Sequence, residues 1–137
     1  MKNLFITLIT TAVLLYTFSG VAFAKSKEKF IDGETNWSTS KVKRYIYKVW
    51  ADRGPKEQKK AYAVFRAESG LSCKKTSKSN DVGVAQINKI HWKRFGGKER
   101  LKACKQNIDA AKIIYKEWGN SFRAWTAYKY GSYKAFL

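Results

Sequence analysis

The chain has 137 residues and a formal net charge of +18, and 45% of its residues are hydrophobic. This length suits one domain with a compact core, and the sequence has no repeats or low-complexity linker that would indicate a second domain. One histidine and two cysteines, Cys73 and Cys104, exclude a zinc site of normal ligand spacing, and no metal or other cofactor is expected.

The N-terminal residues have the pattern of a secretory signal peptide. An apolar run from Leu4 to Phe18 follows a short basic start, and Ala22-Phe23-Ala24 fits the small-x-small cleavage pattern. The run is short for a retained membrane anchor, and no later segment could span a membrane. The sequence therefore predicts a secreted or periplasmic protein with a signal peptide over 1–24, a flexible lead-in over 25–36 and a domain over 37–137.

Export determines how the cysteines and the charge are interpreted. In an oxidising compartment the two cysteines predict one Cys73–Cys104 disulfide. Loss of Lys2 with the signal peptide lowers the charge from +18 to +17, which still implies an anionic partner. Nucleic acid is one candidate, and lysines interleaved with aromatic residues from Lys41 to Trp50 would suit it. Export favours the other candidate, a cell wall with carboxylates and anionic polymers.

Two consecutive helices are predicted between Ser38 and Gly70. Either Ser38 or Ser40 can cap the first helix, which ends at Arg53-Gly54. Its apolar face is formed by Val42, Ile46, Val49 and Trp50. Pro55 suits the first turn of the second helix and Gly70 its end. The second helix carries an apolar face of Ala61, Val64 and Phe65.

Glu68 lies on the apolar face of the second helix, in its last turn. Burial and the negative end of the helix dipole both disfavour its charge, so both raise its pKa. A general acid that works near neutral pH needs such a raised pKa. From this segment alone, an exposed glutamate that ends a helix is the simpler interpretation.

The rest of the chain predicts one small β element and two further helices. A polar loop over 73–80 precedes Asp81–Asn88, whose Val, Ile and Gly residues predict a small hairpin. A helix is predicted over Asn107–Trp118 with Ile108, Ala111, Tyr115 and Trp118 on its apolar face. Ser121 could cap a last helix that carries Phe122, Trp125 and Tyr128. The predicted fold class is α+β and mostly helical.

Four motifs in order resemble those of lytic transglycosylases of the lysozyme superfamily, including small exported forms. They are Glu68-Ser69, Asp81-x-Gly83 running into Gln86-Ile87-Asn88, Asn107-Ile108, and Ala127-Tyr128 before Gly131. The resemblance spans 61–133 and departs from the family pattern at Lys129, usually Asn, and at Val84-Ala85, usually Leu-Met. It implies a lysozyme-like fold with a small β-hairpin, and the glycan strands of peptidoglycan as substrate.

The resemblance also implies roles for individual residues. Glu68 is the acid that protonates the glycosidic oxygen. Ser69 holds Glu68 or its water, or else is a polar residue at the end of the helix. Gln86 and Asn88 are amides that bind N-acetyl groups, or else form structural hydrogen bonds within the hairpin. Tyr128 is a substrate-binding residue or a core residue. His91 and Trp92 could border the same site, although a structural role is the simpler interpretation for both.

Asp81 has two interpretations. A similar Asp-x-Gly stretch carries the second catalytic carboxylate of animal C-type lysozymes, whereas Asn80-Asp81 also suits a plain turn, which we favour. Transglycosylases of this type need one Glu, because the sugar's own 6-hydroxyl attacks the anomeric carbon. The resemblance thus implies cleavage between N-acetylmuramic acid and N-acetylglucosamine with 1,6-anhydro ends, and a hydrolytic lysozyme is the alternative.

Two non-enzymatic functions remain as hypotheses. One is a basic exported protein that binds the wall through a degenerate site, and the other is a nucleic-acid binder. The intact Glu68-Ser69 and Gln86-Ile87-Asn88 motifs argue against the first hypothesis. Export together with the motif series argues against the second.

Overall fold

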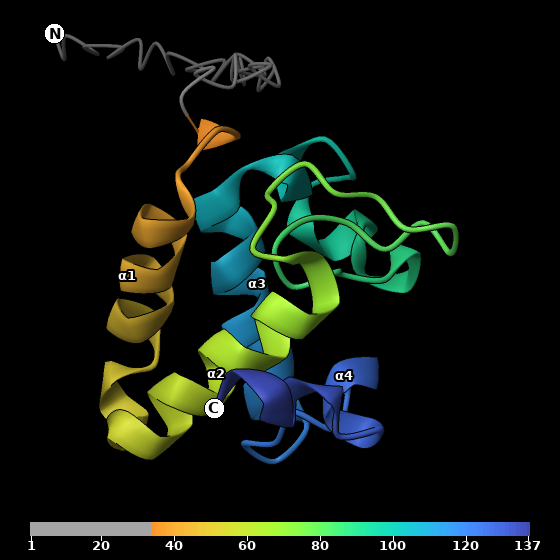
Figure 1. Cartoon of the computed structure of the whole chain (residues 1–137). Helices are drawn as coiled ribbons and strands as arrows, with labels where there is room; N and C mark the ends of the chain where they lie inside the picture. The colour runs from red at the N-terminus through yellow and green to blue at the C-terminus, as the bar shows by residue number, and fades with distance from the viewer. Residues whose placement is uncertain (1–33) are drawn as a thin grey trace, which may run out of the picture.

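A computed structural model describes residues 34–137 (Figure 1). The predicted signal peptide and residues 25–33 of the predicted lead-in lie outside the described residues. Within the described part, no helix is both long and apolar enough to cross a membrane.

The first two helices form where they are predicted, but the first ends at Val49 rather than at Arg53-Gly54, and a 3₁₀ helix over Ala51–Arg53 follows it. Helix α1 spans Thr39–Val49, and Ser38 is its cap, because the Ser38 hydroxyl accepts a hydrogen bond from the Lys41 N–H at 3.3 Å. Helix α2 spans Gly54–Ser69 and ends at Gly70, whose φ of 67° is in the left-handed region that favours glycine.

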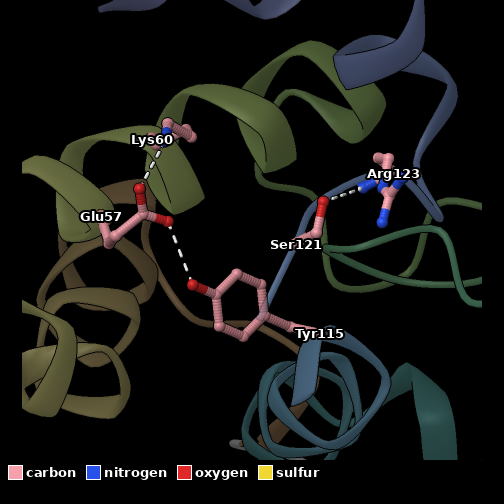
Figure 2. Close-up of polar contacts among 5 residues, drawn as sticks. All are labelled: Glu57, Lys60, Tyr115, Ser121 and Arg123. Atoms are coloured by element: carbon pink, nitrogen blue, oxygen red, sulfur yellow. Dashed lines mark hydrogen bonds and ion pairs between the residues drawn. The ribbon is translucent and has the colours of Figure 1, made fainter. Parts of the chain in front are cut away.

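The last two helices differ from prediction at their starts. Helix α3 spans Cys104–Glu117 and so begins before the predicted Asn107, and helix α4 spans only Thr126–Lys129. Ser121 does not cap α4: its hydroxyl accepts the Arg123 N–H at 3.3 Å within a turn (Figure 2). The described chain also contains short 3₁₀ helices at Ala51–Arg53, Lys89–His91, Lys93–Phe95, Arg100–Lys102 and Ser132–Phe136.

A tight turn stands where the sequence predicts a small β-hairpin over 81–88. The described residues contain two isolated antiparallel bridges in this region, Thr76 with Val82 and Val82 with Ile87, and no strand. The chain reverses at once because Gly83 and Gln86 both have positive φ, of 80° and 48°. The Asn107 side chain holds the turn by binding the backbone on either side of Gly83.

Aromatic rings from α1, α2, α3 and the turn before α4 form the core. Trp50 is fully buried, and its ring lies 5.4 Å from that of Phe65, 5.9 Å from Tyr115 and 6.0 Å from Phe122. Glu57 in the first turn of α2 accepts a hydrogen bond from the Tyr115 hydroxyl at 3.1 Å and also pairs with Lys60 (Figure 2). Trp118, predicted on the buried face of α3, is instead 47% exposed, because α3 ends just before it.

The predicted disulfide is present. Cys73, in the loop after α2, is bonded to Cys104, the first residue of α3, with their Cα atoms 4.9 Å apart. Closing a loop of about 32 residues stabilises the folded chain by roughly 3–4 kcal/mol in the chain-entropy model. The bond fixes the loop over 72–80 against α3, close to the end of α2.

Candidate active site

Glu68 lies half-buried in the last turn of α2 and is held by the start of α4. Its Oε1 accepts a hydrogen bond from the Ala127 N–H at 2.7 Å. The start of α4 is fixed in turn by Trp125, whose buried indole N–H donates to the Ala85 carbonyl at 2.8 Å. The Glu68 carboxyl is thus oriented by a backbone donor that lies 59 positions later in the sequence.

Several groups act on the Glu68 carboxyl in opposite directions. Burial is the largest effect and raises its pKa, and the nearby charge of Asp81 raises the pKa further. The N–H groups of Ala127 and Thr126 lower it, as does the positive charge of Lys75. The net result is a raised pKa. Such a carboxyl keeps its proton to a higher pH than an exposed glutamate does, which is what a general acid requires.

Ser69 joins the end of α2 to the turn over 82–87. Its buried hydroxyl lies 2.6 Å from the Val84 carbonyl oxygen and 3.2 Å from that of Phe65, and it donates to these two acceptors. Within the described residues it forms no hydrogen bond with Glu68. The structure therefore places Ser69 where it fixes the turn relative to α2.

Asp81 is fully engaged by its own loop. Its Oδ1 accepts a hydrogen bond from the Asn88 amide at 2.6 Å, and its Oδ2 accepts from the hydroxyls of Ser79 at 2.5 Å and Ser77 at 3.3 Å. Its backbone N–H donates to the Ser77 hydroxyl at 2.9 Å. This pattern is that of a turn former, although its charge acts on Glu68.

The amides of Gln86 and Asn88 also bind the chain itself. The Gln86 NH₂ donates to the carbonyls of Gly83 at 2.9 Å and Lys75 at 3.2 Å. The Asn88 carbonyl oxygen caps the 3₁₀ helix at Lys89–His91 by accepting the Ile90 N–H at 3.2 Å. Both side chains nevertheless line a pocket of about 50 Å³. These residues therefore have a structural role in the turn, and they also border this small pocket.

His91 and Trp92 follow the turn over 82–88 in the sequence, and Tyr128 lies in α4. His91 lines the same pocket as Gln86 and Asn88, and burial lowers the pKa of its imidazole, with the neighbouring Arg94 acting in the same direction. Trp92 packs against the core, and its indole N–H donates to the Ile87 carbonyl at 3.3 Å. Tyr128 is half-buried in α4, and its ring stacks on that of Tyr133 at 5.1 Å.

Two residues contribute to the site without having been predicted to do so. Asn107, expected only at a helix start, is completely buried and binds both Val82 and Ala85. Lys75 donates from its ammonium group to the Glu68 carbonyl at 3.0 Å. The motif series includes Asn107 but gives no sign of its contacts, and nothing in the sequence distinguishes Lys75 from other loop lysines.

The larger pockets lie apart from Glu68. A pocket of about 320 Å³ between α1 and α2 is lined by Lys43, Tyr62 and Arg66 and contains none of the predicted site residues. Among residues 34–137, no group of three or more His, Cys, Asp or Glu side chains is placed to hold a metal ion. The candidate site is therefore the region of Glu68, Asp81 and the turn over 82–88.

Comparison with known families agrees with the motifs. The model of the transglycosylase SLT domain matches residues 46–135, which is well over half of the chain. No curated protein and no solved structure matches the chain. The matched segment contains α2, the turn over 82–88, α3 and α4, and therefore every residue of the candidate site. The chain belongs to the transglycosylase SLT domain family, a class of enzymes that cleave glycosidic bonds in peptidoglycan.

Proposed function

We propose that the protein is a lytic transglycosylase that cleaves the bond between N-acetylmuramic acid and N-acetylglucosamine and leaves 1,6-anhydro-muramic ends. The observation that carries the proposal is the Glu68 carboxyl, half-buried, raised in pKa and oriented by the Ala127 N–H. These are the properties that a single carboxyl needs if it is to protonate a leaving oxygen.

In the proposed reaction Glu68 acts first as an acid and then as a base. Its proton passes to the glycosidic oxygen as the bond from that oxygen to the muramic anomeric carbon breaks. The carboxylate that remains accepts the proton of the muramic 6-hydroxyl, whose oxygen bonds to the anomeric carbon. Glu68 ends protonated as it began, and no water is consumed. The Ala127 N–H supports the charged intermediate form of Glu68, because it donates to Oε1.

A hydrolytic lysozyme is the alternative, and it would need Asp81 as a second catalytic carboxylate. The hydrogen bonds from Asn88, Ser79 and Ser77 explain Asp81 as a turn former, so its presence does not by itself require a second catalytic carboxylate. A nucleophile or electrostatic partner of a retaining glycosidase faces the sugar about 5 Å from the acid.

Asp81→Asn should reduce lytic activity only modestly, by less than about tenfold, since the change keeps a polar turn former and removes only a secondary charge. Clearing of a suspension of purified peptidoglycan measures the rate. Asp109→Asn is the matched control, because Asp109 also has both oxygens bonded, to Tyr45 and Lys105, but lies on α3 away from Glu68. A folded Asp81→Asn protein that has lost nearly all activity would favour the lysozyme alternative.

We further propose that the enzyme is exported to the periplasm or the medium, with 1–24 as its signal peptide, 25–36 as a lead-in and 37–137 as its catalytic domain. The Cys73–Cys104 disulfide is consistent with an oxidising compartment. The net charge of +17 that remains after loss of the signal peptide would hold such an enzyme on anionic wall polymers as well as on its glycan substrate. We expect no nucleic-acid partner and no membrane anchor after cleavage.

A further inference from the structure

Lys75 is bonded to the backbone of Glu68. It lies in the loop after α2, and its ammonium group donates to the Glu68 carbonyl at 3.0 Å. That carbonyl is one of the last four of α2, which have no partner within the helix itself. The side chain of Lys75 thus supplies a hydrogen bond that the end of the helix would otherwise take from water.

The backbone of Lys75 holds the opposite side of the site. Its carbonyl accepts hydrogen bonds from the Gly83 N–H at 2.8 Å and from the Gln86 amide at 3.2 Å. Because its side chain reaches Glu68, this one residue connects the end of α2 to the turn that carries Gln86 and Asn88. A change in its side chain removes the bond to α2 and keeps the backbone contacts with Gly83 and Gln86.

The side chain of Lys75 is one of the charged groups that act on the Glu68 carboxyl. Among the described residues it forms no ion pair with a carboxylate. The groups that act on the Glu68 carboxyl are the N–H donors of Ala127 and Thr126 at the start of α4, and Asp81 and Lys75 from the loop after α2. Lys75 is the cation of this set and Asp81 the anion.

We propose that Lys75 is a positioning residue for Glu68, which fixes the carbonyl at the end of α2 and places a positive charge beside the carboxyl group. The proposal rests on the proposed role of Glu68. A residue that acts first as an acid and then as a base must hold a proton for the first step and accept one in the second. Its pKa should therefore be neither very low nor very high. Burial favours the protonated form, and Lys75 opposes it by favouring the carboxylate.

A carbon-13 titration of the Glu68 carboxyl tests the proposal without any assay of activity. The mature protein is labelled with ¹³C-glutamate, and the Glu68 signal is assigned by its absence from Glu68→Gln. Lys75→Met and Lys75→Gln remove the charge, and we expect both to raise the midpoint of the Glu68 titration, because a neighbouring positive charge favours ionisation. Lys75→Arg should restore the wild-type midpoint. Lys78→Met is the matched control in the same exposed loop and should leave the midpoint unchanged.

The pH dependence of lysis gives a second readout. Activity requires a protonated Glu68, so the alkaline limb of the profile should move to higher pH in Lys75→Met and remain in place in Lys75→Arg. At the optimum we expect the Lys75→Met rate to fall about three- to tenfold through loss of positioning. An unchanged Glu68 midpoint in both uncharged variants would overturn the proposal. If the uncharged variants shift the Glu68 midpoint but the wild-type protein does not digest peptidoglycan, the role of Lys75 stands and the proposed function is contradicted.

Discussion

Glu68→Gln should lower lytic activity by about 10²–10⁴-fold and leave the fold intact, because general acid catalysis contributes a factor of this size. The glutamine carbonyl can still accept the Ala127 N–H that holds Glu68 in the native protein, so orientation is kept while the transferable proton is lost. Rates on purified peptidoglycan measure the loss, and thermal unfolding followed by circular dichroism verifies the fold.

The matched control for this substitution is Glu99→Gln. Glu99 is an exposed residue whose carboxylate pairs with Lys102 on the surface, and such pairs contribute little to stability. This variant should keep the wild-type rate, which separates the loss of a particular carboxyl from the loss of any one negative charge. A Glu68→Gln protein that retains near wild-type activity would show that Glu68 is not the acid.

Asn107→Ala should destabilise the fold by about 3 kcal/mol, since it leaves several buried backbone groups without partners. The Asn107 side chain accepts the Ala85 N–H at 2.7 Å and donates to the carbonyls of Val82 and Leu101, each at 2.8 Å. The same side chain packs so closely on Gly83 that a Cβ there would lie 2.2 Å from its nitrogen. Loss of this contact should also loosen the turn and reduce lytic activity.

Urea unfolding of Asn107→Ala against Gln106→Ala measures the effect. Gln106 is the preceding residue on α3, is half-buried, and forms no hydrogen bond through its amide in the described part of the chain. A free energy of unfolding that is equal in the two variants would mean that the Asn107 hydrogen bonds do not hold the turn.

The helices that could be predicted from the sequence are those whose ends are determined locally. Ser38 caps α1 and Gly70 ends α2, and the period of the apolar residues between them places Glu68 on the buried face. Each of these signals depends on residues within about four positions of one another.

The features that could not be predicted depend on contacts between distant residues. The Ala127 N–H binds the Glu68 side chain across 59 positions of sequence. The Asn107 side chain binds the Ala85 N–H across 22 positions, in the segment where a hairpin was expected. Helix α4 is short, and the irregular segment before it places the rings of Phe122 and Trp125 in the core. Residue types in the motifs identify the family, but the partners of Ser69, Asp81 and Lys75 emerge only from the folded chain.

The masses of wall fragments released by the wild-type enzyme test the central claim most directly. Purified peptidoglycan is digested to completion, and the muropeptides are separated and their masses are measured by mass spectrometry without prior reduction. A transglycosylase that uses the muramic 6-hydroxyl as nucleophile leaves muramic ends that are lighter by one water than hydrolysed ends and that resist borohydride. We predict these 1,6-anhydro ends as the main product. Reducing muramic ends that take up hydrogen from borohydride would contradict the proposal and identify the enzyme as a hydrolytic lysozyme.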